Sequence, residues 1–274
     1  ENQGEQILPD IAKAITEKLK EKALGREEIA GIGVGVPGPV NAEGDVLCAV
    51  NLFWGYKKVS KELSEMTGIP VKTENDANVA ALGEAWKGAA AGAHNVVMVT
   101  LGTGVGGGII VNEKILSGAH GASGEIGHIN VDHGEEESCN CGNKGCLEQM
   151  ASATGVVRLA KKALENSSRD SMLREGELTA KAVFDAYKAG DKITEEVVEK
   201  FGDYLGGALA SVTCVTDPSV IVVGGGVSKA GQPLIDCVTK YYKKYAFSAC
   251  KATPIILAAL GNDAGIYGAA KVVV

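Results

Sequence analysis

Two apolar segments of this chain each run into a cluster of glycines, and this pattern constrains the fold more than any other feature. Residues 95–101 (NVVMVTL) continue into GTGVGGG at 102–108, and residues 219–223 (SVIVV) continue into the glycine triplet 224–226. Short apolar runs that end at glycine are typical of buried strands that leave a sheet through a tight loop. Because a long helical stretch separates the two segments, the pattern predicts an α/β protein with glycine loops at the carboxyl ends of strands.

The rest of the chain alternates between helix and strand patterns. Apolar residues at helical spacing predict a first helix over 6–24, with Gly25 as its C-cap. Residues 29–40 predict a buried strand that enters a Pro-Gly turn, and residues 41–50 predict a hairpin turn followed by a second strand. Further helices are expected at 60–68, 76–90, 155–166, 178–188, 193–215, 233–245 and from Asn262, and further strands at 69–74, 107–116 and 254–260.

Length and composition exclude several classes of protein. At 274 residues the chain is long enough for two lobes or for one large α/β domain. Its net charge of −7, without a cluster of Lys and Arg interleaved with aromatics, makes nucleic acid an unexpected partner. No apolar run approaches the roughly 20 residues that span a bilayer, and residues 1–25 do not form a signal peptide. We therefore expect a cytoplasmic protein with no membrane partner.

Three of the seven cysteines lie close together in the segment 139–148, CNCGNKGCLE. Two glycines in this segment let the backbone fold back, so the thiolates of Cys139, Cys141 and Cys146 can converge as soft metal ligands. His128 would complete a Cys3His set, which is a common closed zinc site, whereas a redox pair or plain loop cysteines are the alternatives. The other cysteines follow apolar patterns and are expected to be small buried residues: Cys48, Cys214, Cys237 and Cys250.

Several polar residues admit both a functional and a structural interpretation. The loop LGTGVGGG offers backbone N–H groups and the Thr103 hydroxyl to phosphate oxygens, but its glycines are equally consistent with a steric role. Asn75 and Asp76 stand where a strand enters a helix. There Asp76 could accept a hydroxyl proton beside an orienting amide, or it could simply be the N-cap of the helix. Glu125 and Glu148 flank the cysteine segment, either as surface charges or as acceptors for a polyol.

Together these motifs resemble the ROK family, which contains repressors, uncharacterised reading frames and sugar kinases. EIGH at 125–128 followed by CNCGNKGCLE fits the family's zinc signature CxCGxxGCxE. ENDAN at 74–78, GVPGPV at 35–40, LGTGVGGG and VVGGG also match, so the resemblance covers essentially the whole chain. Among members, the sequence is most similar to the glucokinases of Gram-positive bacteria.

The resemblance implies a fold and a division into lobes. The fold would be the actin-like ATPase fold, ribonuclease H-like and hexokinase-type, with two α/β lobes around an active-site cleft. Residues 1–93 and 262–274 would form the small lobe, and residues 94–261 would form the large lobe with the zinc site. A homodimer or homotetramer is also expected.

The resemblance further implies an activity and its residues. The protein would use ATP with Mg²⁺ to phosphorylate a hexose at its 6-hydroxyl, with glucose as the first candidate, Asp76 as general base and a structural Zn²⁺. N-acetylmannosamine, fructose and allose are handled by similar scaffolds. The sugar would be bound by Asn51, Asn75, Asp76, Glu125, His128 and Glu148, ATP by Gly102, Thr103, Gly104, Gly106, Gly107, Gly224, Gly225 and Gly226, and zinc by His128, Cys139, Cys141 and Cys146.

The sequence departs from the family pattern in one respect. Actin-like kinases open with a hairpin that carries a DxGGT phosphate loop, and no such motif precedes the helix at 6–24. We therefore expect this form to lack the first strands, roughly 30 to 50 residues, and to be a poor kinase. The alternative is a sugar-responsive repressor of the same family whose DNA-binding segment lies upstream. A zinc-stabilised binding module without catalysis is a second alternative.

Overall fold

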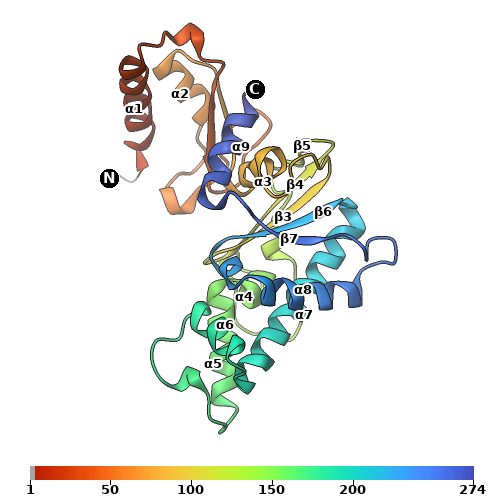
Figure 1. The fold of residues 1–274 in the computed structure, drawn as a ribbon. Coiled ribbons are helices and arrows are strands. Elements are labelled where there is room, and N and C mark those ends of the chain that lie inside the picture. The colour runs from red at the N-terminus through yellow and green to blue at the C-terminus, as the bar shows by residue number, and fades with distance from the viewer. Residues whose placement is uncertain (1–3) are drawn as a thin grey trace.

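A five-stranded mixed sheet organises the larger part of the molecule, which we call the large lobe. The structure is a computed structural model and describes residues 4–274 (Figure 1). Strand β3 is antiparallel to β4 on one side and parallel to β6 on the other, and β6 is parallel to β7. The order in the sheet is β5 (Lys114–Ile115), β4 (Val105–Val111), β3 (Val96–Leu101), β6 (Val220–Gly224) and β7 (Ile255–Leu257).

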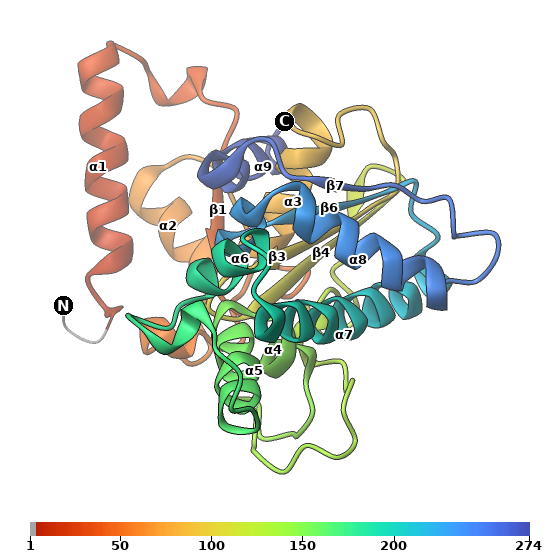
Figure 2. The same ribbon diagram turned by 60° about the horizontal axis from the view of Figure 1, so that its bottom comes forward.

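The two faces of this sheet bury different partners, because successive side chains of a strand point to opposite faces. On β3, Val97 and Val99 join the core beneath the helices of the large lobe, where α7 and α8 run side by side (Figure 2). Val96 and Met98 face the other way and pack against α3. The helices on the first face are α4 (Leu147–Ala151), α5 (Ala153–Glu165), α6 (Ala180–Lys188), α7 (Lys192–Thr216) and α8 (Gln232–Tyr245).

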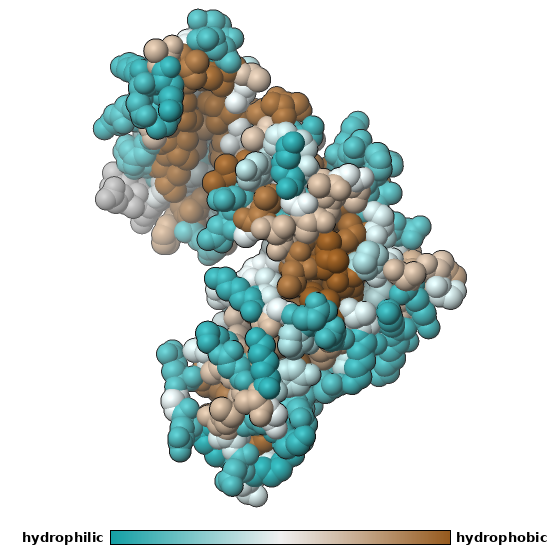
Figure 3. Space-filling view, viewed as in Figure 1, coloured by the Kyte–Doolittle hydropathy of each residue, from teal (hydrophilic) through white to brown (hydrophobic). Residues whose placement is uncertain are grey.

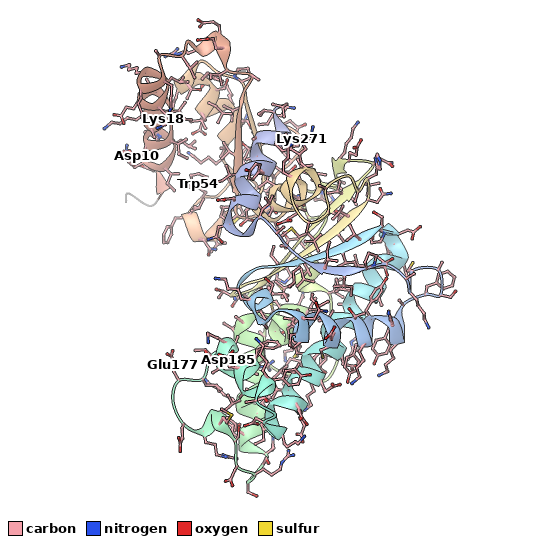
Figure 4. All side chains as sticks on the ribbon, viewed as in Figure 1. Asp10, Lys18, Trp54, Glu177, Asp185 and Lys271 are labelled. Atoms are coloured by element: carbon pink, nitrogen blue, oxygen red, sulfur yellow. The ribbon has the colours of Figure 1, made fainter. Side chains whose placement is uncertain are left out.

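A second group of elements, the small lobe, lies above the large sheet in Figure 1. Its strands β1 (Ile32–Val36) and β2 (Val71–Asn75) form a parallel pair. The chain passes between the lobes twice, once from α3 to β3 and once from β7 to α9. Trp54 and Lys271 mark the small lobe in Figure 4, and Glu177 and Asp185 mark the large lobe. The helices of the small lobe are α1 (Ile7–Lys22), α2 (Val59–Thr67), α3 (Asp76–Lys87) and α9 (Ala264–Val272).

Helices α3 and α9 pack unusually closely, and glycine makes this possible. A Cβ atom on Gly83 would lie 2.0 Å from the carbonyl oxygen of Ala264, and one on Gly268 would lie 1.6 Å from the carbonyl oxygen of Val79. Any side chain at these positions would have to push the helices apart. The pair therefore packs in direct backbone contact between the strands of the small lobe and the sheet of the large lobe.

Most of the predicted elements are present, but the first fifty residues differ in two places. Helix α1 ends at Lys22 with Ala23 in the left-handed conformation, so the predicted C-cap at Gly25 is wrong. Residues 41–50 contain no strand, and only isolated bridges such as Val40 to Val46 occur there. The Asn41 side chain accepts hydrogen bonds from backbone N–H groups within this segment, which favours a turn over a sheet ladder.

Two further expectations need correction. Cys237 and Cys250 are buried as predicted, but Cys48 and Cys214 are exposed. Cys48 lies in a loop beside the cleft, and Cys214 lies on the outer side of α7, so apolar neighbours in the sequence were a poor guide to their burial. The short helix α4 was not predicted, because five residues are too few to show a helical period. Within residues 4–274, no helix is both long and apolar enough to cross a membrane.

Candidate active site

A pocket of about 530 Å³ opens between the two lobes, where the surface in Figure 3 is hollowed. The small lobe contributes the turn Pro37–Gly38 and the loop around Asn51, and the large lobe contributes the start of β4. The structure brings all of the predicted sugar-binding residues to this single pocket. They are Asn51, Asn75, Asp76, Glu125, His128 and Glu148.

The turn from β2 into α3 presents two of these residues in different ways. Asn75 is the N-cap of α3, and its side-chain oxygen accepts hydrogen bonds from the backbone N–H groups of Ala77 (2.9 Å) and Asn78 (3.1 Å). Its amide also donates to the carbonyl oxygen of Gly38, which ties the helix start to the Pro-Gly turn. The expectation that Asp76 is the N-cap is therefore wrong. Since Asn75 performs the capping, the carboxylate of Asp76 is free for another role.

The carboxylate of Asp76 lines the pocket. It accepts one hydrogen bond, from the backbone N–H of Ala77 at 2.9 Å. The side chain is open to solvent, yet the pocket walls around it displace enough water to raise the pKa of Asp76 above its ordinary value. The hydrogen bond from Ala77 opposes this shift. A carboxylate with a raised pKa is a stronger base, so this environment suits proton acceptance.

Glu148 connects three parts of the site. It lies in the first turn of α4, two residues after Cys146, and one of its oxygens accepts a hydrogen bond from the backbone N–H of Val105 at 3.1 Å. The other oxygen is 3.8 Å from the Sγ of Cys139. Gly104 leaves room for this carboxylate, since a Cβ there would lie 2.0 Å from it. Glu148 therefore joins the cysteine segment to the glycine loop between β3 and β4.

The four residues of the predicted zinc site converge. The ligand atoms of His128, Cys139, Cys141 and Cys146 all lie within 4.8 Å of one another. The Sγ atoms of Cys141 and Cys146 are 3.6 Å apart, and the Nδ1 of His128 is 3.8 Å from the Sγ of Cys139. A tetrahedral ion with Zn–S bonds of about 2.3 Å requires S···S separations of about 3.8 Å. The cluster thus has both the chemistry and the spacing of a Cys3His metal site.

His128 faces two ways. Its Nδ1 points to the cysteines, while its Nε2 is 3.9 Å from a carboxylate oxygen of Glu125, inside the pocket. Burial raises the pKa of Cys146 to about 12, so this thiol needs a cation beside it to become a thiolate. A metal at this position would therefore fix the ring of His128 and, with it, one wall of the pocket.

Residues 128–148 form the arm that carries the cysteines. Side chains outside the metal cluster also bind this arm. Arg158 on α5 pairs with Glu135 and, at 3.1 Å, with Glu137. The hydrogen bond from Arg158 lowers the pKa of Glu135 to about 2. On α7, the hydroxyl of Tyr204 donates to Asp132 at 2.9 Å. Sequence analysis missed these supports, because the partners lie 20 or more residues apart and neither partner belongs to a recognisable motif.

The two glycine loops lie next to each other, at the carboxyl ends of the neighbouring strands β3 and β6. The parallel register pairs Thr100 of β3 with Gly224 of β6, so both strands leave the sheet at the same level. Backbone N–H of Ala153, at the start of α5, donates to the carbonyl oxygen of Gly102 and holds the first loop. Gly225 has a φ of 84° and packs against the backbone of Leu101, which only glycine permits.

The remaining predicted nucleotide residues fall in different surroundings. Gly106 and Gly107 line the main pocket, whereas Gly226 lines a separate small pocket of about 190 Å³. Thr103 is exposed, and its carbonyl oxygen accepts a hydrogen bond from the hydroxyl of Thr154. The small pocket is mainly apolar, and its walls include Phe184, Asp185, Val227, Lys229 and Ala230.

A model described as the ROK family matches residues 1–274. The chain belongs to the ROK family. A glucokinase from Halalkalibacterium halodurans, a Gram-positive bacterium, is 42% identical over 271 residues, which are 97% of this chain and 82% of the relative. This agrees with the resemblance found in the motifs. A putative xylose repressor from a Caldicellulosiruptor species is also similar, at 30% identity over 89% of this chain and 62% of its own length.

Solved structures of ROK proteins share the fold. The ROK hexokinase from Thermus thermophilus superimposes with a TM-score of 0.82 at 33% identity, over 97% of this chain and 85% of its own. A ROK glucokinase from Streptomyces griseus, solved in complex with glucose and AMPPNP, gives a TM-score of 0.77 at 32% identity, over 96% and 87% of the two chains. The predicted two-lobed, actin-like fold is therefore confirmed.

Proposed function

We propose that this protein transfers a phosphoryl group from ATP to the 6-hydroxyl of glucose in the cleft between its lobes. The chain is an ATP-dependent hexokinase, as its similarity to curated glucokinases supports. The observation that carries the assignment to this cleft is the convergence of six predicted sugar residues on one pocket whose wall is a glycine loop. The lobes would be residues 1–93 with 262–274, and residues 94–261.

The pocket can hold a sugar between two sets of acceptors. Carboxylates accept hydrogen bonds only, so Glu125 and Glu148 suit hydroxyl groups at one end of a hexose. The Nε2 of His128 would bind there too, while Asn51 and Asn75 offer amide groups on the side of the small lobe. Asp76 would then face the 6-hydroxyl, and it would take the proton of that hydroxyl as the new bond to phosphorus forms.

The nucleotide would lie along the glycine loops. Gly102, Thr103, Gly104, Gly106 and Gly107 would leave the phosphates close to backbone N–H groups, and Mg²⁺ would neutralise the charge that develops on them. The small pocket beside the glycine triplet has the size and apolar character that suit a base. Its position favours an adenosine passing Gly224, Gly225 and Gly226.

Zinc would be structural in this enzyme. The Cys3His set leaves no open position for substrate, which is the arrangement of structural rather than catalytic zinc. Held by the ion, the arm would keep His128 and Glu148 in place without taking part in the reaction. The protein would act as a homodimer or homotetramer in the cytoplasm, and light scattering of the purified protein would test the oligomeric state.

A coupled-enzyme assay of the full-length protein with ATP tests the proposal, because the 274-residue form by itself is expected to be a poor kinase. Glucose, N-acetylmannosamine, fructose and allose would be compared at equal concentrations, and we expect the highest kcat/KM for glucose. A different preferred sugar would change the substrate and keep the reaction. If no sugar is phosphorylated while glucose still binds with measurable heat, the kinase proposal is wrong, and the alternative of a sugar-responsive repressor would be favoured.

A further inference from the structure

Glu84 is a carboxylate that the proposed chemistry does not use, and its position in the fold is unusual. It lies near the end of α3 and is completely buried, with 0% of its surface exposed. Within residues 4–274 no cation pairs with it. Its acceptor oxygens are satisfied instead by backbone N–H groups, from Ala89 at 2.7 Å, Ala259 at 3.0 and 3.1 Å, and Leu260 at 2.8 Å. Several N–H donors of this kind can stabilise a buried carboxylate.

These donors lie on the two segments that connect the lobes. Ala89 lies two residues after the end of α3, at the start of the connection to β3. Ala259 and Leu260 follow β7, at the start of the connection to α9, which Figure 1 shows as the blue segment leading back toward the small lobe. One side chain therefore binds both crossings of the chain, although Ala259 and Leu260 lie 175 and 176 residues after Glu84.

The surroundings of Glu84 leave its carboxylate little freedom to move. A Cβ on Gly88 would lie 2.0 Å from a carboxylate oxygen of Glu84, so the backbone closes directly over it. Gly83, which directly precedes Glu84, packs against Ala264, the first residue of α9. The same helix begins with Asp76, so α3 carries the proposed base at one end and the shared anchor of both connections near the other.

From this geometry we propose that Glu84 is a positioning residue that fixes the point about which the lobes move, and thereby sets Asp76 against the glycine loop. The inference rests on the proposed kinase function for its consequence in catalysis. Its structural content, that Glu84 holds the two connections together, is independent of any substrate.

Glu84→Gln tests the inference on the full chain. The substitution keeps the shape of the side chain but replaces one acceptor oxygen with an NH₂ group, which cannot accept from the N–H groups around it. If a charge-assisted hydrogen bond is lost from only one of two lobe positions, the equilibrium between these positions shifts about 10- to 100-fold. We expect kcat for glucose to fall by about that factor, while equilibrium binding of glucose to the unliganded protein changes less than about threefold.

A matched control separates positioning from general destabilisation. Tyr242 is a fully buried residue of the large lobe, and its hydroxyl donates to the carbonyl oxygen of Cys250 at 2.7 Å, away from the cleft and both connections. Tyr242→Phe removes a buried hydrogen bond and should leave kcat within about twofold. Glu84→Asp, one methylene shorter, serves as a second test if the Gln variant does not fold.

Amide hydrogen exchange of the unliganded protein gives a readout without catalysis. Exchange in segments 88–93 and 258–262 should be faster in the Glu84 variants than in the wild type or in Tyr242→Phe. Unchanged exchange in these segments, or a kcat no lower than that of the control, would overturn the role of Glu84. A wild-type protein that phosphorylates no sugar would instead overturn the proposed function, and the exchange result would still decide on Glu84.

Discussion

Replacing Asp76 by Asn should separate catalysis from stability. Within residues 4–274, the only hydrogen bond to the carboxylate comes from the backbone N–H of Ala77, and an Asn oxygen can accept the same bond. What is lost is the negative charge at the start of α3, an interaction worth about 0.3–1 kcal/mol. Loss of a general base costs about 10²- to 10⁴-fold in rate. We therefore expect kcat for glucose to fall by that factor and the free energy of unfolding to change by less than about 1 kcal/mol.

Asn75→Ala is a useful comparison for stability, because it should destabilise the fold whereas Asp76→Asn should not. Asn75 caps α3 and donates to Gly38, so its removal should lower the free energy of unfolding by about 1 to 2 kcal/mol. Chemical denaturation gives the stability of each variant, titration calorimetry gives glucose affinity, and the coupled assay gives kcat. An Asp76→Asn variant that keeps more than about a tenth of the wild-type kcat would refute the role of Asp76 as base.

The pH dependence adds a second check on Asp76. Burial raises its pKa above 3.8, so the base becomes protonated at a higher pH than an exposed Asp would. As pH falls through this raised value, kcat/KM of the wild type should decline, because the ionised form is the active one. The small residual rate of Asp76→Asn should not show this decline. A wild-type profile that stays flat down to about pH 4 would contradict the assignment.

Three further predictions concern the arm that carries the cysteines. Metal analysis should find about one zinc per chain, and its removal by a chelator should lower Tm and raise the KM for glucose. Glu148→Gln removes a charged acceptor from the pocket and should raise KM about 10-fold or more with a smaller change in kcat, measured by the coupled assay. Arg158→Ala should lower the free energy of unfolding by about 2 kcal/mol at pH 7. Since Glu135 has a pKa of about 2, below its ordinary 4.5, this difference should persist above pH 4.5 and vanish as pH falls toward 2 in denaturation experiments.

Local patterns in the sequence were enough to place the functional elements. Strands that end in glycine predicted the central sheet, and the spacing of Cys139, Cys141 and Cys146 predicted their convergence with His128. These features succeed because both the strand period and the ligand spacing depend on residues close together in the chain. The residue roles in the pocket, by contrast, came from the family resemblance and stay predictions.

Features that depend on distant partners could not be predicted. Glu84 looks like one more charge on a helical pattern, and most of the donors that satisfy it approach from the other end of the chain. Arg158 is similar, since its partners lie on a loop with no regular period. At the turn into α3 the difficulty was competition between neighbours. Two adjacent residues could each cap the helix, and Asn75 does so because, as the last residue of β2, it still has an extended conformation.

Because α3 is closely packed near Glu84, a small rotation of the helix at that end displaces Asp76 at the other end. Glu84 lies eight residues after Asp76, so at 1.5 Å per residue the two are about 12 Å apart along the axis of α3. A rotation of only 5° at the anchored end would carry the base through about 1 Å, a displacement that can cost about 100-fold in rate. Small changes far from the sugar, on the outer side of α9 or in either connection, can therefore tune this enzyme without touching its pocket.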